Sequence, residues 1–137
     1  MKKKNYIALI PARSGSMGLK NKNLMKINNK TLIEIAVSNL INSKIVKNIY
    51  VSSNSKKILN LAKSAGANII KRPEKYSNNK STASQVVKHF LSKIKTGMND
   101  HLIYLQPSSP LKDSKHIVRA IKLFEKKRSN TLLSCYL

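Results

Sequence analysis

The stretch IALIPARSGSMGLKNKN, residues 7–23, decides how this chain of 137 residues is interpreted. It begins as an apolar run that breaks at Pro11, continues as a loop of small residues, and ends in alternating Lys and Asn. Glycines let backbone N–H groups approach a ligand closely, and such groups beside Arg and Lys are typical of a phosphate site. The spacing fits neither the Walker A loop nor the dinucleotide fingerprint. Taken alone, the stretch indicates either a phosphate-binding loop or a basic surface loop.

Apolar runs alternate with amphipathic runs along the rest of the chain. The apolar runs predict strands at residues 6–12, 48–54, 68–72 and 101–110, the last ending in a Pro-bounded loop, with a further strand beginning at 130. Helical spacing predicts helices over residues 31–41, 55–66 and 82–97, and from 113 or 114 onward. Thr31 and Glu34 have the spacing of a capping box. Ser55 is suited to begin the second helix, and Gly66 to end it.

This alternation of strands and helices predicts a parallel α/β sheet with helices on its faces. In such sheets ligands bind at the carboxyl ends of the strands. We therefore expect the site among the polar segments that follow the strands, which are residues 13–23, 52–55, 72–84 and 106–110.

The charge balance is strongly basic, with 27 Lys and Arg against 5 Asp and Glu and a formal net charge of +22. Such a surface attracts polyanions. The lysines are spread along the whole chain, aromatic residues make up only 5%, and no zinc-finger spacing appears. Specific nucleic-acid binding is therefore not expected, although a basic nucleic-acid-binding module stays open as an alternative.

The chain shows no apolar stretch of membrane-spanning length, so no membrane partner is expected. Residues 1–12 imitate a signal peptide, but their apolar core is short, and we expect a cytoplasmic protein. Cys135 cannot form an intrachain disulfide and is expected in the core. His89, His101 and His116 are expected to be surface or hydrogen-bonded histidines.

Four segments resemble, in order, the motifs of the acylneuraminate cytidylyltransferase family. IPARSGSMGLKNKNL resembles its first motif, and YVSSN resembles its V-S-T-D strand end. KRPEKYSNNKSTAS is similar to its R-P-x-x-L loop, and LIYLQPSSPL to its L-Q-P-T-S-P-L motif. Together these segments span nearly the whole chain. The resemblance implies a three-layer Rossmann-like nucleotidyltransferase fold with a mostly parallel sheet, truncated at the C-terminus.

The activity implied by the resemblance is CMP transfer from CTP to a sialic-acid-like nine-carbon ulosonic acid of the sialic, legionaminic or pseudaminic type. The products are a CMP-sugar and pyrophosphate. The resemblance also implies that Arg13 and Lys22 hold the triphosphate as the catalytic pair. Further nucleotide contacts would come from Ala12, Ser14, Gly15, Ser16, Asn23, Arg72 and Ser84. Gln106 would face the sugar, with Pro107, Ser108 and Ser109 shaping that wall.

Simpler interpretations remain for several of these residues. Arg72 could be a solvated Arg at a strand end, Asn23 could be a turn residue, and Ser108 and Ser109 could serve only to form a turn.

The sequence departs from the family pattern at Met17, Asn54 and Asn79, where the resemblance implies a basic residue and two aspartates. An amide keeps an acceptor but loses the charge. Family members are also longer than this chain, and residues 1–137 are expected to form one incomplete nucleotide-binding domain. The part beyond it is expected to supply Mg²⁺ ligands, sugar contacts and a dimer interface.

The five acids of this chain are not expected to form a metal site of their own. A homodimer or a complementing chain is expected as partner. A truncated non-catalytic remnant that keeps the fold stays open beside the enzyme.

Overall fold

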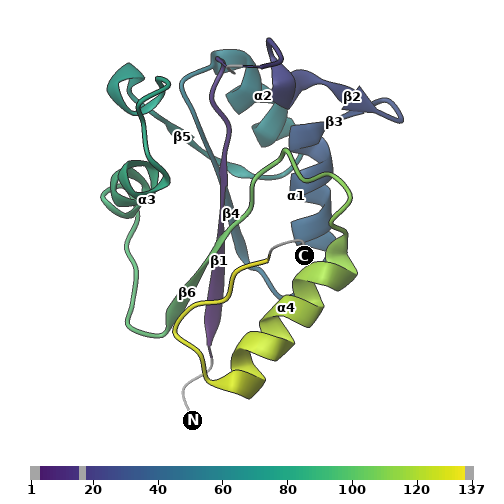
Figure 1. The fold of residues 1–137 in the computed structure, drawn as a ribbon, viewed down its shortest axis with the longest axis vertical. Helices are drawn as coiled ribbons and strands as arrows, with labels where there is room; N and C mark the ends of the chain where they lie inside the picture. The colour runs from purple at the N-terminus through teal and green to yellow at the C-terminus, as the bar shows by residue number, and fades with distance from the viewer. Residues whose placement is uncertain (1–3, 16–17, 135–137) are drawn as a thin grey trace.

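The computed structural model describes residues 4–15 and 18–134, which contain one four-stranded parallel sheet (Figure 1). Its strands are β1 (Asn5–Pro11), β4 (Asn48–Ser53), β5 (Asn68–Lys71) and β6 (Asp100–Tyr104), in the order β5-β4-β1-β6. Strand β1 lies in the middle, with Leu9 opposite Tyr50 on one side and opposite Tyr104 on the other. The parallel α/β architecture expected from the sequence is confirmed.

Helices cover both faces of this sheet and make three layers (Figure 1). Residues of α1 (Leu32–Asn42), α2 (Lys56–Ser64) and α4 (Ser114–Lys127) share one core cluster with the strands, and α3 (Ala83–Leu91) contributes to a second.

Successive side chains of a strand point to opposite faces, and β1 follows this rule. Ala8 and Ile10 belong to the first cluster, whereas Ile7 and Leu9 pack in the second with Phe90 of α3. Strand β1 is therefore buried on both faces, which explains its unbroken apolar sequence.

The helices begin where capping residues were expected. The Thr31 hydroxyl accepts from the Glu34 N–H, and the Glu34 carboxylate accepts from the Thr31 N–H at 2.7 Å. Ser55 caps α2, and Thr82 and Asp113 form capping boxes at the starts of α3 and α4. Gly66, with φ of 101°, follows the end of α2 in the backbone conformation that favours glycine.

Two boundaries differ from the expectation. Helix α3 ends at Leu91, well before Gly97, and the Ser92 hydroxyl donates to the His89 carbonyl at 2.6 Å. Residues 131–134 form no strand, although one was expected to begin at 130. Leu133 is 85% exposed, and the four-stranded sheet of the described residues does not include this segment. Cys135 lies outside the described residues.

A short hairpin of β2 (Lys26–Ile27) and β3 (Lys30–Thr31) was not expected. Its turn residues Asn28 and Asn29 have φ of 49° and 65°, the left-handed pair that a two-residue hairpin turn requires. Two 3₁₀ turns, η1 (Lys22–Leu24) and η2 (Glu74–Tyr76), lie in the loops after β1 and β5. Among the described residues, no helix has the length and apolarity needed to cross a membrane.

Candidate functional site

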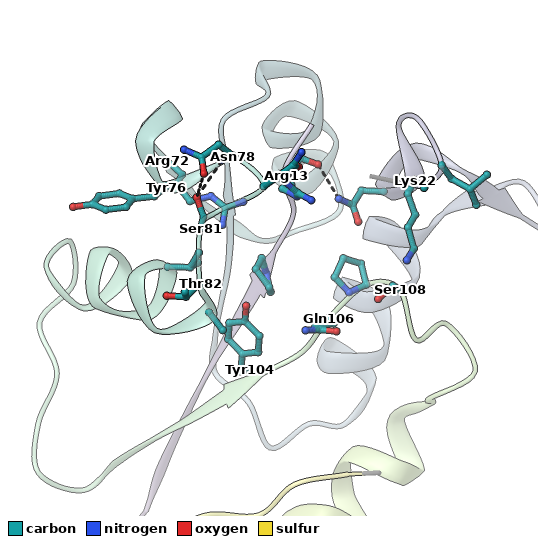
Figure 2. A pocket seen from close by; sticks show the side chains of 18 residues that line it. Arg13, Lys22, Arg72, Tyr76, Asn78, Ser81, Thr82, Tyr104, Gln106 and Ser108 are labelled. Carbon is teal, nitrogen blue, oxygen red and sulfur yellow. Dashed lines mark hydrogen bonds between the residues drawn. The ribbon is translucent and has the colours of Figure 1, made fainter. Parts of the chain in front are cut away.

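A cleft of about 510 Å³ opens at the carboxyl ends of β1 and β6 (Figure 2). Pro11 at the end of β1 and Tyr104 at the end of β6 both line it. The chain leaves β1 towards β4 on one side and returns to β6 on the other. This reversal of strand order is the switch point at which parallel sheets open a crevice for ligands. The cleft therefore lies where the topology predicts a site.

Three cationic side chains line the cleft, and they come from three different segments. Arg13 follows β1, Lys22 begins η1, and Arg72 follows β5. In Figure 2 the Lys22 side chain extends towards the wall that carries Gln106 and Ser108. No Asp or Glu is among the described residues that line the cleft. This arrangement gives the cleft a positive potential suited to an anionic ligand.

Arg72 is buried, with only 4% of its surface exposed, and its Nε has no hydrogen-bond partner among the described residues. Burial lowers the pKa of its guanidinium; the Tyr104 phenol opposes this shift and the nearby Arg13 charge adds to it. Its backbone N–H donates to the Ser53 carbonyl at 2.8 Å, which fixes the chain at the end of the sheet. Arg72 is thus not the solvated strand-end residue of the simpler interpretation. A buried cation that lacks a partner is costly unless an anion pairs with it.

Arg13 is held by amide side chains on two sides. Its Nη1 donates to Asn79 Oδ1 at 2.7 Å, and its carbonyl accepts from Asn23 Nδ2 at 3.0 Å. Asn23 is only 9% exposed and also lines the cleft. The loop after β1 is therefore anchored to both η1 and the loop after β5.

Three further residues predicted on this loop, Ala12, Ser14 and Gly15, are not among the described residues that line the cleft. Ala12 is fully buried, and its N–H donates to the Ser52 carbonyl at 2.9 Å. The Ser14 N–H donates to Asn54 Oδ1 at 3.0 Å, and its hydroxyl accepts from Asn54 Nδ2 at 3.0 Å. Gly15 has open space where a Cβ would stand. Ser16 and Met17 lie outside the described residues.

Only some of the residues predicted to face a sugar line the cleft. Gln106, Pro107 and Ser108 line the cleft, but Ser109 lies at a small separate crevice beside α1. Its N–H donates to the Gln106 carbonyl at 3.3 Å, as in a turn. Ser84 is exposed on α3 and does not line the cleft, because the helix start places Ser81, Thr82 and Ala83 there instead.

Sequence reasoning missed the two tyrosines of the cleft, Tyr76 and Tyr104. Burial raises the pKa of Tyr104, and the Arg72 charge opposes that shift. Its place at the last position of β6 was the signal that could have found it. The Tyr76 ring packs against His89, with 5.6 Å between the ring centroids.

The expectation for the histidines fails at His89. Its Nδ1 is buried without a partner among the described residues, and burial lowers its pKa. His101 is partly buried between Tyr6 and Phe124, and His116 is exposed in the capping box of α4.

The described residues do not fit a complete magnesium site. Magnesium usually takes one or two carboxylates together with substrate phosphates and waters. Within residues 4–15 and 18–134, no group of three or more His, Cys, Asp or Glu side chains gathers. Glu74 hydrogen-bonds to Asn54 and is not among the lining residues. The cationic side chains are therefore the described groups that can neutralise a phosphate here.

Comparisons with known proteins agree with this geometry. Residues 7–135 match the model of a family described as Cytidylyltransferase. N-acylneuraminate cytidylyltransferase of Escherichia coli is 38% identical over 119 residues, which cover 87% of this chain and 28% of that relative. A Helicobacter pylori protein named pseudaminic acid cytidylyltransferase and UDP-2,4-diacetamido-2,4,6-trideoxy-beta-L-altropyranose hydrolase is 29% identical, over 90% of this chain and 24% of its own length.

Among solved structures, CMP:2-keto-3-deoxy-manno-octonic acid synthetase, solved in complex with CTP, superposes with a TM-score of 0.74. The match covers 91% of this chain and 49% of that one, at 19% sequence identity. It supports the expected three-layer nucleotidyltransferase fold with a mostly parallel sheet. The chain spans about a quarter of the length of the two relatives above, at 28% and 24%.

Proposed function

Because this chain belongs to the cytidylyltransferase family, we propose that it binds CTP in the cleft and takes part in CMP transfer to a sialic-acid-like ulosonic acid. One observation carries the proposal: three cations converge on a cleft whose described lining includes no carboxylate, and one of them is the buried Arg72, whose Nε has no partner among the described residues. CTP brings the negative charge that such a cleft lacks.

In the proposed reaction the anomeric oxygen of the sugar forms a bond to the α-phosphorus of CTP. The bond from that phosphorus to the β-phosphate oxygen breaks, pyrophosphate leaves with the electron pair, and the hydroxyl proton passes to solvent. The reaction needs no covalent nucleophile on the protein. It depends on alignment of the two substrates and on neutralisation of phosphate charge.

The residues of the cleft divide between these two tasks. Arg13 and Lys22 neutralise the triphosphate, and the planar guanidinium of Arg72 pairs with an oxygen of the nucleotide. Gln106 and Ser108 lie on the opposite wall, where they can hydrogen-bond to the sugar. Magnesium stays in the proposal only as the cofactor that the sequence motifs imply, since the described lining supplies no carboxylate that would hold it.

The sugar class rests on the two sequence relatives named above, whose names refer to N-acylneuraminate and pseudaminic acid. It is the class that the sequence motifs also imply. We propose the same class here, with sialic, legionaminic and pseudaminic acids as the compounds to compare.

Calorimetry with CTP tests the binding step. Lys22→Ala should weaken CTP binding about tenfold, since it removes one charged contact worth roughly 1.5 kcal/mol. Lys20→Ala is the matched control, because Lys20 is exposed and does not line the cleft, and it should change affinity less than about twofold. If the two substitutions weaken CTP binding equally, CTP is attracted only by the general surface charge, as expected for a nucleic-acid-binding module.

A pyrophosphate-release assay tests the transfer step. CTP, magnesium and a panel of ulosonic acids should release pyrophosphate only when a sugar of the nine-carbon class is present. CTP binding without any pyrophosphate release would favour the alternative of a non-catalytic remnant that keeps the fold and the nucleotide.

A further inference from the structure

Asn54 directly follows β4 and connects two loops at the carboxyl end of the sheet. Its Oδ1 accepts from the Ser14 N–H at 3.0 Å, and its Nδ2 donates to the Ser14 hydroxyl oxygen at 3.0 Å. The same Nδ2 donates to Glu74 Oε1 at 3.0 Å and Oε2 at 3.2 Å. One amide therefore ties the loop after β1 to η2, the turn that follows β5.

The polarity of these bonds requires an amide. A carboxylate accepts hydrogen bonds and donates none, so the atom of residue 54 that faces Glu74 must be a donor. The other end of the same side chain must accept from the Ser14 N–H. Asn provides both, whereas Asp at this position would place two carboxylates against each other.

We propose that Asn54 is a positioning residue that holds the Ser14 backbone for CTP binding, and that Glu74 is the reason an amide stands at position 54. The proposal rests on the proposed function, because it assigns the loop after β1 to the triphosphate. Arg13 immediately precedes Ser14 and lines the cleft. With its own carbonyl held by Asn23 and its neighbour held by Asn54, Arg13 has its main chain fixed on both sides.

Exchange of charge between the two positions supplies a sharp test. Asn54→Asp puts two carboxylates in contact, and CTP affinity should fall about five- to tenfold at low salt. Glu74→Gln alone keeps an acceptor for Asn54 Nδ2 and should stay within about twofold of the parent, since Glu74 does not line the cleft.

The double variant Asn54→Asp with Glu74→Gln restores the parent's net charge with the donor and acceptor reversed. The amide introduced at position 74 and the Ser14 hydroxyl then donate to the carboxylate introduced at position 54. CTP affinity should therefore recover to within about threefold of the parent. Because like charges near a surface are screened by salt, the defect of Asn54→Asp relative to the parent should shrink at high salt. A double variant as weak as Asn54→Asp overturns the proposal, as does an Asn54→Asp variant that binds CTP like the parent.

Amide hydrogen exchange at Ser14 gives a readout that needs no nucleotide. The parent and the double variant should protect this N–H, and Asn54→Ala should lose that protection while the amides of β1 keep theirs. Unchanged exchange at Ser14 in Asn54→Ala contradicts the positioning role whatever happens with CTP. If Asn54→Ala loses protection at the Ser14 N–H but the parent itself does not bind CTP, Asn54 still positions Ser14 and the proposed function is refuted instead.

Discussion

Replacement of Arg72 by Met should make the ligand-free protein more stable and bind CTP more weakly. Arg72 is 4% exposed, its Nε has no partner among the described residues, and burial lowers its pKa. A buried group without its partner carries a desolvation penalty of about 1–3 kcal/mol. Met has a similar length and no charge, so the substitution removes that penalty and keeps most of the apolar packing.

The expected changes have opposite signs. The free energy of unfolding of the ligand-free protein should rise by about 1–3 kcal/mol, for the reason that buried ions are often replaced by apolar groups with a gain in stability. CTP affinity should fall at least about 30-fold, because removal of one partner of a desolvated charge pair costs about 2 kcal/mol or more. Urea unfolding measures the first quantity and calorimetry the second.

Arg72→Lys is the matched control, because it keeps the positive charge but loses the planar guanidinium. It should give no gain in stability and an intermediate loss of CTP affinity. If Arg72→Met lowers the free energy of unfolding, the guanidinium stabilises the fold and the reasoning is wrong. CTP affinity unchanged by Arg72→Met would equally refute it.

Three further outcomes are expected. Gly66 has φ of 101°, so Gly66→Ala should lower the free energy of unfolding, measured with urea, by about 1–2 kcal/mol. Gly15→Ala is the control: its added methyl meets no atom within 4 Å, and the free energy of unfolding should stay unchanged. Backbone and side-chain hydrogen bonds lower the pKa of Asp100 in the folded state, so its contribution to stability is present above about pH 4 and lost as the pH falls. Asp100→Asn should therefore reduce the drop in melting temperature that the parent shows at acidic pH. Melting temperatures of parent and variant that fall equally with pH would refute this. Asn79→Ala removes an exposed hydrogen bond from the Arg13 guanidinium and should change CTP affinity by less than about threefold without a measurable change in stability.

The sheet and the starts of the helices could be predicted because their causes are local in sequence. A capping box joins residues three apart, as in Thr31 with Glu34 and Thr82 with Gln85. The apolar run of β1 is a direct consequence of burial on both faces. Residues adjacent in the chain therefore contained enough information for these elements.

The site was harder to predict because its contacts join residues far apart in the chain. Ser14 was expected to contact the nucleotide, yet its polar groups meet Asn54, 40 residues away. From the sequence, Asn54 was only a departure from the aspartate of the family pattern. In the structure its Nδ2 donates to the Glu74 carboxylate, a bond that an aspartate could not make. The family resemblance placed Ser84 in the site, but Ser84 is exposed in the first turn of α3 and does not line the cleft.

The two asparagines of the β2–β3 hairpin show a different kind of omission. Asn28 and Asn29 form a pair suited to a two-residue turn, so the signal was present in the sequence. The flanking strands have only two residues each, which is too short for any alternating pattern to appear. The Asn-Asn pair indicates a turn, but without a recognisable strand on either side the sequence did not predict a hairpin.

The net charge of +22 and the charge inside the cleft act on a ligand in different ways. Exposed lysines raise the local concentration of any polyanion, and salt screens them over about 10 Å. Arg72 is withdrawn from water, so its attraction for a bound phosphate is screened much less. CTP affinity should therefore fall with salt in the parent and in Arg72→Met alike, while the ratio between them stays nearly constant up to about 0.5 M salt. A ratio that approaches one at high salt would mean that Arg72 acts only as another surface charge, and burial would then explain nothing about the selectivity of the site.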